Sequence, residues 1–140
     1  MKKILVTGSA GLVGSALKLF EPFYPYEFIF ADRNTCDLVD QESAYWLITN
    51  YQPDAVIHTA ARVGGIGRNL ASPYEQYTEN IFMNTALIDA CLKFGVKKLI
   101  AYSSVCVFDK YATKLYEDCL QQGEPYPAHK YYAYSKRMGS

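Results

Sequence analysis

The chain has 140 residues, of which 50% are hydrophobic and 20% charged, a composition that is typical of one folded domain and excludes a disordered chain. The 14 Lys and Arg residues balance the 14 Asp and Glu residues, so net charge provides no attraction to nucleic acid or to an anionic membrane surface. No apolar run approaches the roughly 20 residues of a membrane-spanning helix, and we expect neither a nucleic-acid nor a membrane partner.

The apolar pattern predicts alternating strands and helices along the whole chain. In chain order, the predicted elements are a strand at 3–7, a helix at 12–20, a strand at 27–31, a helix at 41–50, a strand at 55–58, a loop at 59–71, a helix from 73 to the region of Gly95, a strand at 98–103, a long loop at 109–129 and a helix from about 129. This alternation predicts an α/β fold, a Rossmann-like doubly wound parallel sheet, with residues 1–140 forming one nucleotide-binding domain.

Local signals mark two of the helix starts. Asp40 is a suitable N-cap for the helix at 41–50, because its carboxylate can accept a hydrogen bond from a free backbone N–H. Ser72-Pro73-Tyr74-Glu75 is a capping box with proline at the first helical position.

A glycine-rich turn joins the first strand to the first helix. Its sequence is Thr7-Gly8-Ser9-Ala10-Gly11-Leu12-Val13-Gly14, with three glycines at a spacing of three. Gly8 permits a tight turn, Gly11 lets a pyrophosphate approach the helix N-terminus, and Gly14 lets the helix pack closely on the strand. The strand before the turn and the helix after it favour dinucleotide binding over a simple turn.

The second predicted strand ends at Ala31-Asp32-Arg33, where dinucleotide-binding folds distinguish NAD from NADP. An acidic residue there holds the adenosine ribose of NAD, whereas an arginine pairs with the 2′-phosphate of NADP. Both residue types are present, so this position leaves the two cofactors open, and the pair can also be an ordinary solvated one.

Tyr132 and Lys136 are four residues apart on the last predicted helix and therefore share one face. A nearby ammonium favours tyrosinate, so we expect a lowered Tyr132 pKa. Tyr126 and Lys130 have the same spacing, but Pro127 argues against a helix through them. Ser104 follows the fourth strand, at the sheet end where ligands bind, and its hydroxyl can hydrogen-bond a carbonyl oxygen there or its own backbone.

The four cysteines, Cys36, Cys91, Cys106 and Cys119, form no C-x-x-C pair, so we predict no metal site. The glycines from Gly8 onward interrupt the apolar N-terminus too early for a signal peptide. We therefore expect reduced thiols and a cytoplasmic location.

The glycine turn, Ser104, Tyr132 and Lys136 together resemble the signature of extended short-chain dehydrogenases/reductases, the NAD-dependent epimerase/dehydratases. Three segments resemble the GDP-L-fucose synthases more narrowly: His58 to Ile66 with Asn69, Ser104 to Phe108, and Tyr132 to Met138. The resemblance covers essentially all of the chain, and its specific parts are the Val63-Gly64-Gly65-Ile66 loop and the Ser-x-Cys arrangement.

The resemblance implies a GDP-sugar substrate, GDP-4-keto-6-deoxymannose, which is epimerised beside its ketone and then reduced to GDP-L-fucose. Ser104, Cys106, Tyr132 and Lys136 match the catalytic positions, with Cys106 as the acid/base group that exchanges protons on carbon. Arg33 matches a position that prefers NADP, while Asp32 departs from the pattern and keeps NAD possible. The cofactor-binding positions implied are Gly8, Gly11, Leu12, Val13, Gly14, Asp32, Arg33, Asp37, Leu38, Ala60, Ala61, Tyr132 and Lys136.

The family pairs its cysteine with a histidine and adds a C-terminal substrate domain, both expected to lie beyond this chain. We expect His58, at a strand end, to be a packed structural residue, whereas no motif places His129 in the site. The alternatives are a cofactor- or partner-binding module without turnover and the N-terminal part of another nucleotide-sugar epimerase or dehydratase. Apolar surface left by a missing C-terminal domain would favour a homo-oligomer.

Overall fold

A computed structural model describes residues 1–139 of the chain. They divide into two compact units. Unit 1 comprises Met1–Ala61 and Phe82–Tyr102, and unit 2 comprises Arg62–Ile81 and the described residues from Ser103 onward. Each unit is described separately below.

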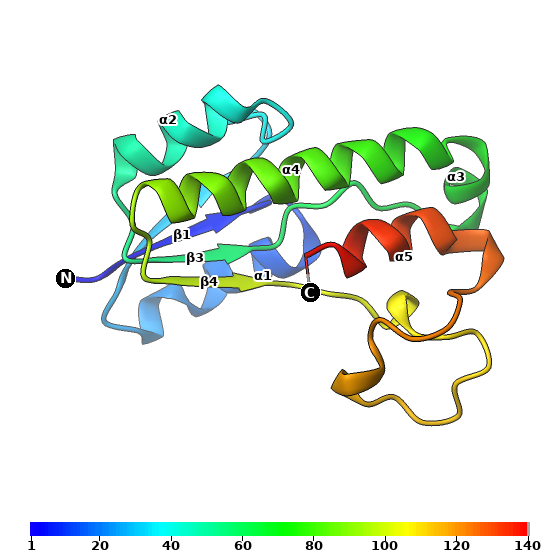
Figure 1. The fold of residues 1–140 in the computed structure, drawn as a ribbon. Helices are drawn as coiled ribbons and strands as arrows, with labels where there is room; N and C mark the ends of the chain where they lie inside the picture. The colour runs from blue at the N-terminus through cyan, green and yellow to red at the C-terminus, as the bar shows by residue number, and fades with distance from the viewer. Residues whose placement is uncertain (140) are drawn as a thin grey trace. The chain divides into compact units, whose positions relative to one another are not determined.

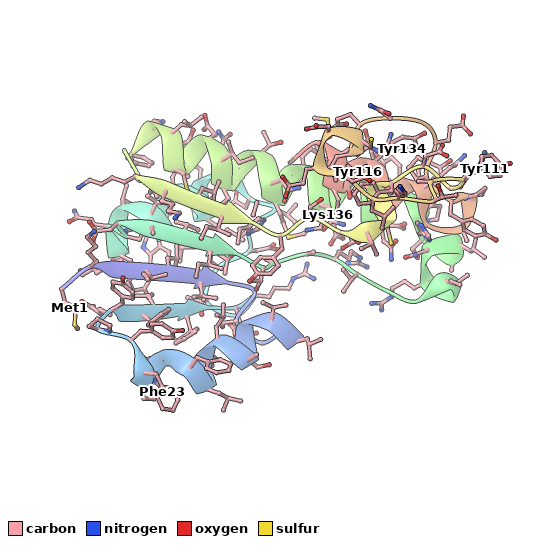
Figure 2. The ribbon with its side chains drawn as sticks, turned by 90° about the horizontal axis from the view of Figure 1, so that it is seen from below. Met1, Phe23, Tyr111, Tyr116, Tyr134 and Lys136 are labelled. Atoms are coloured by element: carbon pink, nitrogen blue, oxygen red, sulfur yellow. The ribbon has the colours of Figure 1, made fainter. Side chains whose placement is uncertain are left out.

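Unit 1 contains a parallel sheet of four short strands in the order β2-β1-β3-β4 (Figures 1 and 2). The strands are β1 (Lys3–Thr7), β2 (Glu27–Ala31), β3 (Ala55–His58) and β4 (Lys98–Ala101). Thr7 is in register with Ala31 on one side and with His58 on the other. The carboxyl ends of these three strands therefore lie together at one edge of the sheet.

The helices of unit 1 cover both faces of this sheet, as Figure 1 shows. Helix α1 (Leu12–Phe20) lies on one face, and α2 (Gln41–Tyr51) and α4 (Pro73–Lys93) lie on the other. A short 3₁₀ turn, η1 (Glu21–Phe23), follows α1, and Phe23 projects outward from it (Figure 2). The predicted doubly wound α/β fold is confirmed.

The core of unit 1 is packed from apolar side chains of the sheet and of α2 and α4. Leu5, Leu47, Val56 and Leu87 are fully buried in it. Burial of such side chains contributes about 1.5–3 kcal/mol each, and this packing holds the carboxyl ends of β1 and β3 in a fixed register.

Helix α2 begins where the sequence predicts. Asp40 is its N-cap, and its carboxylate accepts hydrogen bonds from the backbone N–H of Ser43 (2.9 Å) and from the Ser43 hydroxyl (2.6 Å). These bonds lower the pKa of Asp40. The Tyr45 hydroxyl and the Gln41 amide both donate to Asp89, so α2 and α4 are also joined by polar contacts.

Unit 2 consists of short elements and long connections. They are α3 (Ile66–Ala71), the first part of α4, the 3₁₀ turns η2 (Val105–Val107), η3 (Glu117–Cys119) and η4 (Pro127–His129), and α5 (Lys130–Arg137). The start of α5 agrees with the predicted helix near His129, because Pro127 confines the preceding turn to η4.

The structure corrects two predicted boundaries. The segment 59–71 is not wholly a loop, because Ile66–Ala71 forms α3 after an extended Gly65. The fourth strand ends at Ala101 rather than at residue 103. Tyr102 still donates its N–H to the His58 carbonyl, but Ser103 and Ser104 leave the sheet. The glycines of the first segment hid its helical signal in the sequence, whereas the strand ends before the polar Ser103 and Ser104.

Among the described residues, no helix has both the length and the apolar character that crossing a bilayer requires.

Candidate active site

The glycine turn of unit 1 excludes side chains at two positions. Gly8 has a φ of +72°, and a Cβ there would lie 2.5 Å from the Ala60 backbone nitrogen. A Cβ at Gly14 would lie 2.5 Å from the Gly8 carbonyl oxygen. Ala60 therefore packs against the turn, and α1 packs against it at Gly14.

The amino end of α1 is free of side-chain caps. Gly11 is the N-cap with extended backbone and no capping side chain, and the first-turn N–H groups at Leu12, Val13 and Gly14 have no acceptor within the helix. Leu12 points its side chain outward, with 90% of it exposed. A helix N-terminus with free N–H groups attracts an anion, so this glycine cradle fits the pyrophosphate of a dinucleotide.

Asp32 and Arg33 follow β2 and differ in the polar contacts that their side chains make. The Asp32 carboxylate accepts hydrogen bonds from the N–H groups of Asn34 (2.9 Å) and Thr35 (3.1 Å), and the backbone bond from Thr35 is the main cause of its lowered pKa. Arg33 lies 3.7 Å from Asp37, and both side chains are at least half exposed. Asp32 thus stabilises its own turn, whereas Arg33 remains available to a phosphate.

Leu38 is buried, with 5% of its surface exposed, and belongs to the hydrophobic core of unit 1. Its side chain is therefore not free to contact a cofactor, and a contribution from Leu38 would come through its backbone or by supporting Asp37.

His58 is a packed structural residue, as predicted. It is 3% exposed; its Nδ1 lies 2.7 Å from the Thr7 hydroxyl, and its Nε2 lies 3.0 Å from the Asn84 side-chain oxygen. This chain of polar contacts ties β1 and β3 to α4.

Helix α5 of unit 2 presents three different faces. Tyr132 and Lys136 share one of them, Tyr131 and Tyr134 share another, and Ala133 and Arg137 share a third that is buried. The spacings of three and four residues in an α-helix account for this division. Lys136 itself is only 6% exposed, and burial lowers its pKa.

Ser104 and Tyr132, which the sequence places 28 positions apart, are brought together in unit 2. A hydrogen bond joins the Tyr132 side chain to Ser104. Ser104 also caps η2, since its hydroxyl oxygen accepts from the Cys106 N–H at 3.3 Å. The capping bond places Cys106 on the same turn.

The expected lowering of the Tyr132 pKa is wrong for this structure. Burial is the largest influence and raises the pKa, while the hydrogen bond with Ser104 acts in the opposite direction. Tyr132 is therefore a protonated phenol at neutral pH, which is the form that donates a proton.

The four cysteines are free thiols of two kinds. Cys36 and Cys91 are buried, and burial raises the pKa of each to about 11. Cys106 and Cys119 are partly exposed. Of the two accessible thiols, Cys106 is the one next to Ser104.

Sequence reasoning missed a polar group around the segment after β3. Arg62 makes two hydrogen bonds to Glu79, at 2.8 and 2.9 Å, and Asn80 bonds both the N–H and the carbonyl of Arg62. Several side-chain atoms of unit 2 are buried without a hydrogen-bond partner, namely Arg62 Nε, Asn69 Oδ1 and both amide atoms of Gln76. The sequence carries no signal for this group, because a 17-residue separation hides the contact between Arg62 and Glu79.

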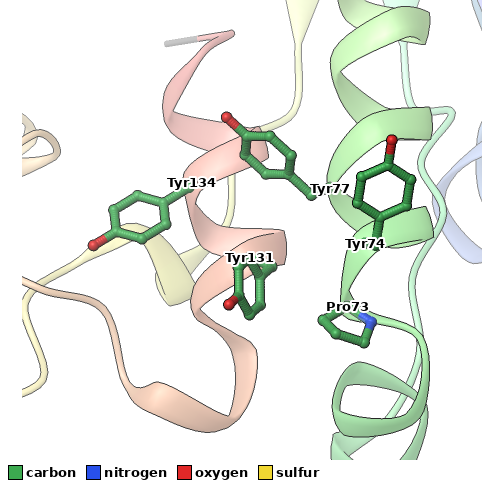
Figure 3. A pocket seen from close by; sticks show the side chains of 5 residues that line it. All are labelled: Pro73, Tyr74, Tyr77, Tyr131 and Tyr134. Carbon is green, nitrogen blue, oxygen red and sulfur yellow. The ribbon is translucent and has the colours of Figure 1, made fainter.

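An aromatic pocket of about 380 Å³ lies between α4 and α5 within unit 2 (Figure 3). Tyr74 and Tyr77 from α4 and Tyr131 and Tyr134 from α5 line it, with Pro73 at the start of α4. It uses a different face of α5 from Tyr132 and Lys136.

Comparison with known proteins gives consistent results. Residues 4–140 match the profile of the NAD dependent epimerase/dehydratase family. The chain is 35% identical over 141 residues to a GDP-L-fucose synthase of Dictyostelium discoideum, covering 98% of this chain and 44% of that protein. It is 36% identical over 139 residues to a GDP-L-fucose synthase of Sinorhizobium fredii, covering 99% of this chain and 44% of that protein.

Among solved structures, a GDP-L-fucose synthetase from Naegleria fowleri bound to NADP superimposes with a TM-score of 0.89 at 34% identity. The match covers 98% of this chain and 45% of that structure. The chain thus spans about 44% of the length of the curated relatives that it matches.

Proposed function

Because this chain belongs to the NAD-dependent epimerase/dehydratase family, we propose that it acts in a nucleotide-sugar epimerase/reductase of the GDP-L-fucose synthase type. The proposed substrate is GDP-4-keto-6-deoxymannose, the product is GDP-L-fucose and the cofactor is NADPH. The observation that carries the proposal is the grouping of Ser104, Cys106, Tyr132 and Lys136 on η2 and α5 of one compact unit.

The proposal for the phosphate and nucleoside parts of the cofactor rests on residues of unit 1. Gly8, Gly11 and Gly14 with the first-turn N–H groups of α1 would hold the pyrophosphate, and Arg33 would pair with the 2′-phosphate of NADP. Asp37, Leu38, Ala60 and Ala61 would contribute to the nucleoside surroundings. When bound, NADPH supplies the hydride that reduces the sugar ketone.

For the epimerisation, Ser104 and Tyr132 would hydrogen-bond the ketone oxygen. Their hydrogen bonds stabilise the negative charge that develops on this oxygen when a neighbouring carbon loses a proton. Cys106 would remove and return protons at these carbons, a role that suits a thiol near neutral pH.

For the reduction, Tyr132 would donate its phenolic proton to the developing alkoxide. The raised pKa keeps Tyr132 protonated before this step. Lys136, one helical turn away on the same face, would stabilise the tyrosinate that the transfer leaves and would contact the nicotinamide ribose.

We also propose that residues 1–140 serve as the nucleotide-binding portion of the enzyme, and that the sugar-nucleotide pocket is completed by a further region or by a second copy. The relatives extend well beyond the region that this chain matches, which supports this division. A binding module without turnover is less favoured, because the named relatives are enzymes.

The experiment that tests the proposal is a titration of the chain with NADPH and NADH, followed by addition of GDP-4-keto-6-deoxymannose. We expect tighter binding of NADPH than of NADH, and NADPH oxidation that depends on the sugar nucleotide. Binding without oxidation would indicate the module without turnover, and the absence of binding would reject the nucleotide site as well.

A further inference from the structure

Arg137, next to Lys136 on α5, is a buried charge that the proposed reaction does not use. Only 9% of this residue is exposed. A buried guanidinium requires several hydrogen-bond acceptors to offset the loss of water. The groups that accept hydrogen bonds from Arg137 within unit 2 therefore indicate its structural role.

The acceptors of Arg137 are all backbone carbonyls of the segment that follows Ser104. Its Nε donates to the Val107 carbonyl at 2.8 Å, and its Nη2 donates to the same oxygen. Nη2 also donates to the Gln122 carbonyl at 2.8 Å, and Nη1 donates to the Gly123 carbonyl at 3.0 Å. One side chain thus binds both ends of the connection between residues 107 and 123.

The base of this connection is closed independently of Arg137. The Asp109 carboxylate accepts from the N–H groups of Tyr111 and Glu124, both at 2.8 Å, and the Lys110 N–H donates to the Glu124 carbonyl. The connection is therefore a closed loop, and Arg137 fastens its base to the last turn of α5. Gln121 adds a hydrogen bond from the loop to α5, because its side-chain amide donates to the Arg137 carbonyl at 2.9 Å.

Val107 is the residue after Cys106 and lies on η2, which Ser104 caps. Arg137 is the residue after Lys136 and lies five positions after Tyr132 on α5. A contact between Arg137 and Val107 thus joins the two segments that carry the proposed catalytic side chains, each one residue away from such a side chain.

We infer that Arg137 is a positioning residue, whose forked guanidinium fixes η2, with Ser104 and Cys106, against the face of α5 that carries Tyr132 and Lys136. Lysine is a poor substitute, because one ammonium group cannot direct donors to three carbonyls in the fixed geometry of a guanidinium. We call the hydrogen bonds from Arg137 to the carbonyls of Val107, Gln122 and Gly123 the clamp. This inference rests on the proposed function, because the clamp matters for catalysis only through the roles proposed for Ser104, Cys106 and Tyr132.

The test measures the alkylation rate of each cysteine by iodoacetamide, read by peptide mass spectrometry, in the parent chain and in Arg137→Met. Loss of the clamp frees η2 to open locally, so we expect Cys106 to react at least tenfold faster. Cys36 and Cys91, buried in unit 1, stay protected if that unit remains folded. Lys110→Met is the matched control, because it removes the Lys110–Glu124 ion pair of the same loop without touching α5, and Cys106 should react at the parent rate.

Arg137→Lys provides a second variant that keeps the charge if the methionine variant does not fold. We expect an intermediate Cys106 rate and faster hydrogen exchange at residues 105–108 than in the parent. A parent-like Cys106 rate in a folded Arg137→Met chain, or parent-like rate and exchange in Arg137→Lys, would overturn the inference.

Binding of NADPH by the parent chain separates this inference from the proposed function. If the parent fails to bind NADPH, the proposed function fails while the alkylation data still decide whether Arg137 clamps η2. If the parent binds and turns over, Arg137→Lys should lower kcat with little change in the KM for NADPH, as a shift of catalytic groups requires.

Discussion

Tyr132 shows how burial can override a sequence motif at the scale of one residue. The four-residue spacing to Lys136 predicts a lowered pKa, but the phenol lies in a partly buried environment that raises it. Lys136 is buried as well, and its own pKa is lowered. Tyr132 therefore begins as a neutral phenol, the form that can donate a proton, and burial disfavours the charged forms of both side chains.

We expect Tyr132→Phe to lower kcat for ketone reduction by at least about 100-fold, the contribution typical of a positioned general acid. Phenylalanine keeps the ring and its packing, so the Kd for NADPH should change by no more than a few fold. Steady-state kinetics and a cofactor titration measure the two quantities. Tyr126→Phe is the control, since Tyr126 shares the spacing to a lysine but lies before α5; equal losses of binding and turnover in Tyr132→Phe would refute the assigned role.

The glycine turn gives a second prediction for single residues. In Gly14→Ala the new methyl group would lie 2.5 Å from the Gly8 carbonyl oxygen and from the Ser9 Cα, and neither backbone atom can move freely. We expect the free energy of unfolding to fall by about 2 kcal/mol or more, measured by urea denaturation. Gly67→Ala on α3 is the control, because its methyl group would meet no atom within 4 Å; equal stability of the two variants would contradict the close packing at Gly14.

At the level of the elements, local signals predicted most of the helices and strands, and the errors arise from a glycine-rich segment and from long-range contacts. Asp40, Pro127 and the apolar runs of the strands act on their immediate neighbours, so their elements are found as predicted. Helix α3 was missed because its six residues follow two glycines and contain a third. Arg137 was missed because its partners are backbone carbonyls 14 to 30 positions away, which leave no mark on a single sequence.

The N-cap of α2 gives a pH-dependent prediction at this scale. Folding lowers the pKa of Asp40 from its ordinary value of 3.8 through hydrogen bonds from Ser43. Its stabilising contribution is therefore fully present above that value and is lost as the pH falls through the lower folded pKa. We expect Asp40→Ala to lower the melting temperature at pH 7. The difference in melting temperature between this variant and the parent should narrow as the pH falls below 3.8.

The matched control for this cap is Asp40→Asn, which keeps an oxygen acceptor but has no charge. It should retain most of the stability at pH 7 and should lack the pH dependence near 3.8. If the difference in melting temperature between Asp40→Ala and the parent stays constant from pH 7 to pH 2, the charged carboxylate has no role in the stability of α2.

At the scale of the whole molecule, the proposed cofactor and catalytic residues belong to different compact units. The glycine turn and Arg33 lie in unit 1, and Ser104, Cys106, Tyr132 and Lys136 lie in unit 2. Unit 1 also exposes apolar side chains on α1, with Leu12 at 90% and Leu19 at 75%, and its strand β4 is at an edge of the sheet with Ile100 at 42%. Exposed apolar groups and an unpaired edge strand favour association with another chain.

We therefore expect the chain to self-associate, with a weight-average mass that rises with concentration in sedimentation equilibrium. Leu19→Lys, which places a charge on the exposed face of α1, should weaken the association. Lys18→Met, a change at the neighbouring residue that removes a charge, should not weaken it. A single monomeric species across the whole concentration range would count against this expectation.

The chemistry proposed for unit 2 is the removal and return of protons by Cys106 at carbons beside a ketone, whose oxygen Ser104 and Tyr132 would hydrogen-bond. Its most direct test is deuterium uptake by GDP-4-keto-6-deoxymannose in D₂O without NADPH, followed by mass spectrometry of the sugar nucleotide. We expect uptake at the two carbons next to the ketone with the parent chain, and at least tenfold slower uptake with Cys106→Ser. No uptake with the parent, or undiminished uptake with Cys106→Ser, would contradict it.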